Sequence, residues 1–232
     1  VKNNIPPYTT CVWTSGAALG TARRTTAALG HSQNSGLILG GDPGGTCTEE
    51  YDGTSWTAGG ALINGGTGAL GLGTQDAGLM AGGTGTNCTE EYNGTSWSSG
   101  GATITVHWLG GGAGTQNAGL AFGGYNAGAP RSCTEDYNGS AWSTGTAMIN
   151  VRLQFQGIGT TQNSVLAAGG CNPSIQALTE EYNGTSWSAG GALIANRADN
   201  GGAGTQNSAV VFNNVTDIPT AEEYDGSAWS KG

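Results

Sequence analysis

Apolar and polar residues form short alternating runs along the whole chain, and no segment has the 3.6-residue apolar spacing of an amphipathic helix. Residues 157–194 contain four such runs, at 157–161, 164–168, 177–182 and 187–194. Asn183-Gly184 separates the last two runs, and both residues tolerate the positive φ that a tight hairpin requires. The pattern predicts four short antiparallel strands, termed a, b, c and d below.

The same arrangement recurs along the chain. A segment close to Glu-Glu-Tyr-Asn-Gly-Thr-Ser-Trp occurs five times, and its tryptophans are Trp56, Trp97, Trp142, Trp187 and Trp229. Four antiparallel strands repeated every 40 to 45 residues or so are typical of a β-propeller blade. We therefore predict an all-β, five-bladed β-propeller that forms one domain over residues 1–232. Its repeats lie at about 20–64, 65–105, 106–150, 151–195 and 196–232.

The two ends of the chain indicate how the ring closes. The segment at about 8–19 has the pattern of a strand d, with no strand a, b or c before it. The last repeat has only Trp229 to Gly232 for its own strand d. We expect the N-terminal strand to complete the fifth blade, because this would join the first and last blades and leave no exposed edge. The first residue is not Met, so the chain is expected to be processed or part of a longer polypeptide.

Composition excludes several classes of protein. The net charge is -9, with 16 acidic and 7 basic side chains, so a broad basic face for nucleic acid is not expected. No apolar run is long enough to insert into a membrane as a helix. The 45 glycines have no period of three, which excludes collagen. In a propeller they have a physical role, because small residues let the innermost strands approach one another around the axis.

The repeats resemble a known family. A Gly-Gly pair after strand b, a Tyr in strand c and a Trp in strand d follow the order and spacing of the kelch repeat. The fuller pattern, Gly-Thr-Gln-Asn-Ala-Gly-Leu-Ala-Phe-Gly-Gly and then Thr-Glu-Glu-Tyr-Asn-Gly-Thr-Ser-Trp, is similar to the kelch-like repeats of tail-fibre proteins of phages, especially marine phages. The similarity covers nearly the whole chain and departs at Asn213-Asn214 and Pro6-Pro7. It implies a virion protein of the phage tail or surface, synthesised in the host cytoplasm.

The five repeats differ mainly at one end of the blades. The a–b turns all read Gln-Asn or Gln-Asp, and the c–d turns all read Asn-Gly or Asp-Gly. At the opposite end lie the b–c loops and the d–a links, the segments that join strand d of one blade to strand a of the next, and these differ in every repeat. A constant scaffold with different loops at one end is how a fold carries a binding site. We call this end the variable face.

The candidate ligand-binding residues all lie on the variable face. They are Arg23, Arg24, Thr25, His107, Trp108, Leu109, Tyr125, Arg131, Arg152, Gln154, Phe155, Arg197 and Asp199. The set contains all five arginines, which makes this face locally positive by about two charges and predicts a ligand with anionic groups, such as a phosphorylated or uronic-acid polysaccharide. Trp108, Phe155 and Tyr125 have side chains suited to stacking on sugar rings.

Two alternatives stay open for these residues. Arg23, Arg152 and Arg197 each lie ten residues after the Trp of the preceding strand d, so a repeated Arg that braces its blade is an equal interpretation. No repeat position requires Trp108, and its alternative role is packing under a neighbouring loop.

The paired acids of strand c, such as Glu180-Glu181, suggest metal binding or catalysis at first sight. Neighbours on a strand point to opposite faces, so one pair cannot clamp one ion, and a structural role is expected, such as bonding the backbone of the adjacent blade or a Trp indole. The five cysteines, an odd number without Cys-x-x-Cys spacing, favour buried free thiols over a zinc site or disulfides. We therefore expect no catalytic residue, no metal and no cofactor.

The variable face and the resemblance together favour a non-catalytic recognition module of a phage particle, a receptor-binding or adhesion protein that binds a host-surface glycan or receptor and contacts other virion proteins. Three alternatives remain: a structural virion component, a propeller lectin of cellular origin and, less favoured, a glycan-cleaving enzyme. Glycan cleavage needs two carboxylates close together in one cleft, and the free acids of the variable face, Asp42, Asp199 and Asp217, lie on different blades.

Overall fold

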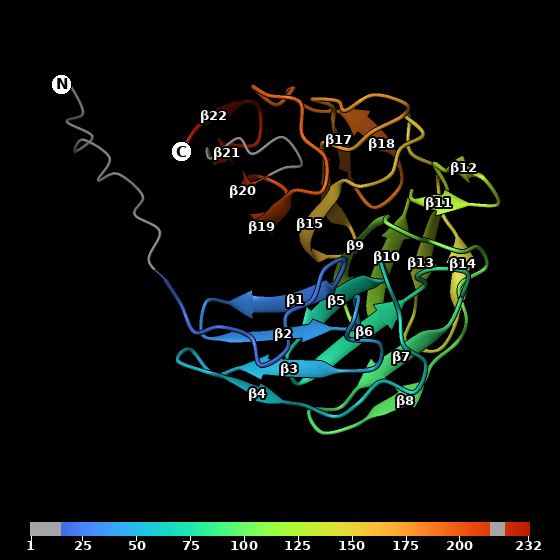
Figure 1. Cartoon of the computed structure of the whole chain (residues 1–232). Helices are drawn as coiled ribbons and strands as arrows, with labels where there is room; N and C mark the ends of the chain where they lie inside the picture. The colour runs from blue at the N-terminus through green and yellow to red at the C-terminus, as the bar shows by residue number, and fades with distance from the viewer. Residues whose placement is uncertain (1–14, 214–220) are drawn as a thin grey trace.

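The computed structural model describes residues 15–213 and 221–232. These residues form five antiparallel four-stranded sheets arranged as a five-bladed β-propeller (Figure 1), as predicted, and contain no helix that could cross a membrane. Blade 1 contains β1 (Ala27–Ser32), β2 (Ser35–Leu39), β3 (Thr48–Tyr51) and β4 (Trp56–Ala58). Blade 2 contains β5 (Leu70–Thr74), β6 (Ala77–Ala81), β7 (Thr89–Tyr92) and β8 (Trp97–Ser99).

Blade 3 contains β9 (Gly111–Thr115), β10 (Ala118–Phe122), β13 (Thr134–Tyr137) and β14 (Trp142–Thr144). Its b–c loop folds into a separate small hairpin of β11 (Tyr125–Asn126) and β12 (Ala129–Pro130). Blade 4 contains β15 (Gln156–Thr161), β16 (Ser164–Ala168), β17 (Thr179–Tyr182) and β18 (Trp187–Ala189). Blade 5 contains β19 (Gly201–Thr205), β20 (Ser208–Phe212), β21 (Glu222–Tyr224) and β22 (Trp229–Lys231).

The Asn-Gly turns fold because the asparagine side chain replaces missing backbone partners. Asn183 accepts hydrogen bonds at its Oδ1 from the amides of Thr185 and Ser186, at 3.0 and 2.9 Å. Gly184 has a φ of +91°, a conformation in which a side chain would be strained. The c–d turns of the other blades repeat this arrangement. The sequence of these turns hardly differs between repeats because the turn itself requires these residues.

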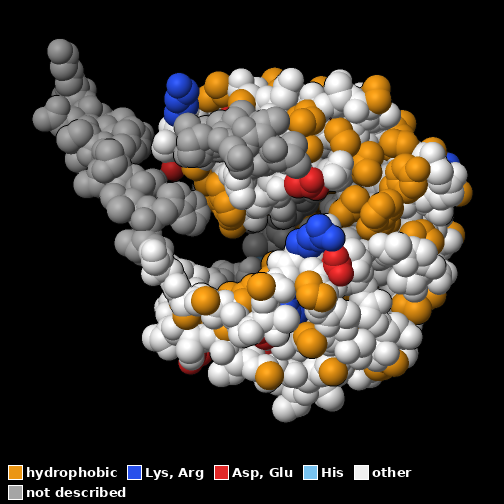
Figure 2. Space-filling model, viewed as in Figure 1, with side chains coloured by type: hydrophobic (Ala, Val, Ile, Leu, Met, Phe, Trp, Pro, Cys, Tyr) orange, Lys and Arg blue, Asp and Glu red, His pale blue; other side chains and the backbone are white. Residues whose placement is uncertain are grey.

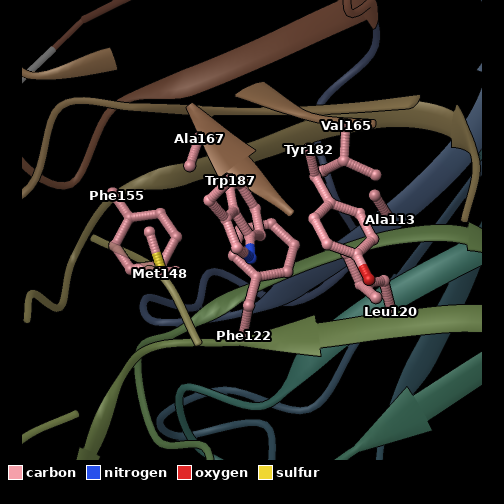
Figure 3. Packing of buried hydrophobic residues seen from close by; sticks show 9 residues of the cluster. All are labelled: Ala113, Leu120, Phe122, Met148, Phe155, Val165, Ala167, Tyr182 and Trp187. Atoms are coloured by element: carbon pink, nitrogen blue, oxygen red, sulfur yellow. The ribbon is translucent and has the colours of Figure 1, made fainter. Parts of the chain in front are cut away.

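Blades 2, 3, 4 and 5 each pack against the blade before them through a similar set of contacts, here called a seam. At the seam between blades 3 and 4, the indole of Trp187 donates to the hydroxyl of Thr134 at 3.1 Å, and its ring lies 4.9 Å from that of Phe122. Gln162 donates to the carbonyl of Gly119 at 2.8 Å. Figure 3 shows these aromatic rings among the apolar side chains that fill this seam. The core is therefore divided into layers between blades.

In three of the four seams a tyrosine hydroxyl bonds to a carboxylate of the preceding blade in the outer part of the seam. Tyr137 of blade 3 donates its hydroxyl to Glu91 of blade 2 at 2.5 Å, and burial together with this carboxylate raises the pKa of Tyr137 to about 12. The neutral phenol is the form that the folded state favours. The stabilisation of the folded state by this neutral phenol is therefore complete below the ordinary tyrosine pKa of 10.0, and it is lost as the pH rises through about 12.

We expect the melting temperature to fall between pH 10 and pH 12, and we expect Tyr137→Phe to reduce this fall, because phenylalanine has no proton to lose. Thermal melts across this pH range would test it. Tyr125→Phe, on the β11–β12 hairpin, is the control and should keep the parent's pH dependence. An unchanged alkaline fall in Tyr137→Phe would contradict the assignment.

Within residues 15–213 and 221–232, the outer strand of the fifth blade is β22, from the end of the sequence. Three residues are enough, because the d strands of the other blades, such as β18, are also three residues long. Of the expected closing strand, residues 15–19 form no strand, and residues 8–14 lie outside the described residues.

Candidate functional site

Four of the thirteen candidate residues lie inside the blades and are not available to a ligand. Their side chains are fully buried, and each lies beside the first acid of a strand-c pair, in the pairs Arg23–Glu49, His107–Glu135, Arg152–Glu180 and Arg197–Glu222. The bracing role left open for the arginines is therefore the one observed, and His107 occupies the same register. The prediction that these four residues contact a ligand is corrected, because their side chains are enclosed within the blades, each beside an acidic partner.

Arg152 illustrates the brace. Its guanidinium donates to the carbonyls of Gly169, Leu178 and Ala167 at 2.6, 2.9 and 3.2 Å, and to the Glu180 carboxylate at 3.2 Å. Burial lowers the pKa of Arg152 to about 10, although Glu180 acts in the opposite direction. This side chain satisfies the carbonyls at the end of strand b, where the chain turns away from the sheet.

The paired acids have the structural role expected of them. The first acid holds the d–a link that arrives from the preceding blade: Glu180 accepts hydrogen bonds from the amides of Ile149 and Asn150 at 2.7 and 3.2 Å. In three of the blades the second acid accepts the tyrosine hydroxyl of the following blade, as Glu181 does from Tyr224 at 2.5 Å. The pairs therefore join neighbouring blades through opposite faces of one strand.

The thiols differ from the expectation of burial. Cys47 is exposed, Cys88, Cys133 and Cys171 are half-buried, and these four form no disulfide. Cys11 lies outside the described residues.

The d–a links meet at one end of the central channel, at what we call the channel mouth. Each link places one residue there in the left-handed region, at the equivalent positions Thr25, Gly68, Leu109, Gln154 and Asp199, with φ between 51° and 64°. Successive members are joined by backbone hydrogen bonds of 2.8 to 2.9 Å, from the amide of each residue to the carbonyl of the one before it. Four of the five are not glycine, and positive φ in such residues is strained and concentrates at functional sites.

Behind the mouth lies a channel of about 670 Å³. Half of the residues that line it are glycine or alanine, most of them from the inner strands, which exposes backbone to the channel. Asn200 also lines it; this residue is 7% exposed, and neither polar atom of its side chain has a hydrogen-bond partner among the described residues. A buried amide without partners is costly, so a polar molecule in the channel would satisfy it.

Polar side chains at the mouth are paired with one another. The Gln154 amide donates to the Asp199 carboxylate at 2.8 Å, and partial burial raises the pKa of Asp199 while this hydrogen bond acts in the opposite direction. Arg24 donates to Asp42 at 2.8 and 3.1 Å, and its side chain is 81% exposed. The mouth therefore offers both donors and acceptors to a ligand.

An aromatic pair lies beside the mouth. Trp108 and Tyr125 are half-buried and meet edge to face at 5.6 Å, where the β11–β12 hairpin is paired with the d–a link of its blade. Trp108 also lies over Gly68, where a Cβ atom would be 2.6 Å from the indole ring. Figure 2 shows hydrophobic side chains gathered on this face beside the central hollow. The alternative role of Trp108, packing under a loop, is thus partly correct, because its ring is in contact with both loops.

Apart from the four buried residues described above, the predicted residues fall into two groups. Arg24, Thr25, Leu109, Gln154, Phe155 and Asp199 line one channel. Trp108, Tyr125 and Arg131 belong to the neighbouring link and hairpin. Asn200 was not among the predicted residues. It directly follows Asp199, and the equivalent position in three of the other four links holds Ala69, Gly110 or Phe155. A polar residue at this position was therefore the signal that could have identified it.

The charge of the variable face is lower than the sequence indicated. Four of the five arginines lie beside an acidic partner, namely Arg23, Arg24, Arg152 and Arg197. Among the described residues, Arg131 is the arginine for which no ion pair is found. A preference for anionic ligands therefore depends on Arg131 and the exposed Arg24.

No family model matches this chain, and no curated protein matches it in sequence. The functional interpretation therefore depends on the geometry of the channel mouth and on the repeat pattern.

Proposed function

We propose that the chain is a non-catalytic recognition module that binds a carbohydrate at the channel mouth. The observation that carries this proposal is the ring of five equivalent left-handed residues, which have one backbone geometry and five different side chains. Structural positions in these repeats keep their residues, as the turns and paired acids do, whereas these positions do not. Strained backbone that supports varied side chains is typical of binding surfaces.

The chemistry of the mouth fits a polyhydroxylated ligand. Gln154, Asp199 and Asn200 supply amide and carboxylate groups that can bond to hydroxyls, and Trp108 with Tyr125 supplies an apolar edge for the face of a sugar ring. Arg24 and Arg131 would select for phosphate or carboxylate groups on that ligand.

The absence of catalysis is part of the proposal. Among the residues that the structure describes, Asp199 is the one carboxylate that lines the channel, and most glycoside hydrolases use a pair of carboxyl groups. A role in a phage particle, as a tail-fibre protein that attaches to a host-surface glycan, is supported by the resemblance of the repeats alone.

Binding to a panel of neutral and acidic bacterial polysaccharides, measured by calorimetry at low and high salt, would test the proposal. We expect Trp108→Ala to weaken binding about tenfold or more, because the apolar edge contributes at least about 1.4 kcal/mol. Arg24→Ala should reduce the salt dependence for acidic ligands while sparing neutral ones.

Ser188→Ala, on the outer strand of blade 4, is the matched control and should bind like the parent. If Trp108→Ala and Arg24→Ala both bound glycan like the parent, the binding site would lie elsewhere on the protein. Failure to bind any glycan would favour a protein receptor or a structural role in the virion.

A further inference from the structure

The main-chain hydrogen bonds around the channel mouth have one break. Four bonds of 2.8 to 2.9 Å join the five left-handed residues in succession, from Thr25 around to Asp199. A fifth bond, from the amide of Thr25 to the carbonyl of Asp199, would close the ring, but it is not found among the described residues. Neither group has another partner in the described part of the chain, so one main-chain donor and one main-chain acceptor at the mouth stay open to a ligand.

Asn200 adds a third unpaired group, directly behind the break. It follows Asp199 in the chain, lines the channel and is 7% exposed, and neither polar atom of its side chain has a partner among the described residues. A buried amide without partners destabilises the folded protein. Because Asn200 lines the channel, a turn about its side-chain torsions is enough to bring the amide to a polar group inside it.

The repeats show that the fold does not need an amide at this place. Ala69, Gly110 and Phe155 hold the equivalent position in three of the other four links. The ring of Phe155 is 6% exposed and packs on that of Phe122 at 5.6 Å, so an apolar side chain fills this position without leaving a polar atom unpaired. Asn200 is therefore a local exception that costs stability, and such exceptions are expected at functional sites.

The unpaired groups at the break are all neutral. The Thr25 amide donates, the Asp199 carbonyl accepts, and the Asn200 amide does both. A sugar hydroxyl also donates and accepts, so neighbouring hydroxyls of one sugar ring match this set. A carboxylate on the ligand would only accept, and it would lie near the carboxylate of Asp199, which lines the same channel. The break therefore fits an uncharged sugar residue better than an acidic one.

The channel can take the end of a glycan. Its volume is about 670 Å³, and its lining runs from the left-handed residues to positions three residues further along each inner strand, such as Gly157 and Gly202. Three residues of extended strand span about 10 Å. Among the described residues, none from an a–b turn lines the channel, so a glycan that enters at the mouth also has to leave there. Leu109, the third of the five left-handed residues, lies across the mouth from the break and supplies an apolar wall.

We propose that the channel binds a terminal, uncharged sugar residue of a glycan, with its hydroxyls at the break and its apolar face toward Leu109. This inference rests on the proposed function and deepens it, because it names the part of the glycan that is recognised. The rest of the glycan leaves through the mouth beside the exposed Arg24. Any anionic groups that Arg24 selects belong to this outer part and not to the terminal residue.

Thermal melts with about 100 mM of a free monosaccharide would test the proposal. The probes are glucose, galactose, mannose and N-acetylglucosamine, with glucuronic acid as the charged comparison. We expect at least one neutral sugar to raise the melting temperature of the parent by about 2–4 °C, and glucuronic acid to raise it less. Asn200→Ala should lose this shift, and the fold accepts the substitution because Ala69 occupies the equivalent place. Without sugar, this variant should melt no lower than the parent, because it removes two unpaired polar atoms.

Asn207→Ala, at the exposed a–b turn of the same blade, is the matched control and should keep the sugar shift. The inference is overturned if no neutral monosaccharide shifts the parent, or if Asn200→Ala keeps the shift. A lower melting temperature of Asn200→Ala without sugar would also overturn it, because the fold itself would then use the amide.

These failures can be told apart from a failure of the proposed function. Polysaccharide binding that depends on Trp108, without any response to free monosaccharides, would leave the proposed function in place, and the glycan would then lie across the mouth. If neither polysaccharides nor monosaccharides bound, the proposed function and this inference would both be wrong.

Discussion

Replacing Arg152 with alanine should lower the free energy of unfolding by about 3–5 kcal/mol, because it leaves the Glu180 carboxylate buried without its charged partner. Three backbone carbonyls lose their donor at the same time. Equilibrium denaturation in urea would measure the change, with the slope of the transition used to check that unfolding remains two-state.

Arg24→Ala is the matched control for this substitution. It also removes an arginine from a d–a link and breaks an ion pair, but the pair is exposed, so we expect a change below about 1 kcal/mol. If the two variants lost similar stability, the buried network would not be the brace described above. Under the proposed function, Arg24→Ala should weaken glycan binding more than Arg152→Ala does, because Arg24 lies at the channel mouth and Arg152 lies within its blade.

Gly114→Ala should be the next most damaging change, with a loss of about 2–5 kcal/mol from backbone strain and crowding together. Gly114 has a φ of +103°, and a Cβ atom there would lie 2.4 Å from the carbonyl oxygen of Ala118, which the β9–β10 hairpin fixes in place. Neither partner can move without breaking the sheet. The variant's unfolding transition in urea gives the loss directly.

Gly128→Ala separates the two causes. Gly128 has a φ of +84° in the tip of the β11–β12 hairpin, and a Cβ atom there would have nothing within 4 Å. We expect only the strain component, about 1–2 kcal/mol. Equal losses at the two positions would show that crowding around the inner strands is not what requires glycine.

The sequence predicted the blades well because the signals for them are local. Asn183-Gly184 determines a turn through its own φ angles and side-chain bonds, and the alternation on either side determines the strands. Ring closure was predicted less well. A strand of three residues, β22, carries almost no periodicity, and its pairing with β21 depends on the neighbouring chain rather than on its own pattern.

The sequence correctly placed the d–a links together at one end of the blades, where they meet at the channel mouth. That a ligand binds at this end stays a prediction. The side chains of Arg152 and Arg24 could not be told apart from sequence, since whether an arginine turns into the blade or out of it depends on the position of a carboxylate about 18 to 28 residues away. The left-handed conformation of Leu109 and Gln154 could not be predicted either, because their side chains disfavour it.

The hydrogen bonds that join the successive left-handed residues run between main-chain amides and carbonyls, so these links do not depend on which side chain each member carries. Residues as different as Thr25, Leu109 and Asp199 already occupy equivalent places in it. Side chains at the four positions that are not glycine can therefore change while the main-chain links are kept, whereas Gly68 is held by the Trp108 ring above it. The same property makes the propeller a scaffold for combinatorial libraries, in which four codons diversify one surface while the blades beneath it stay constant.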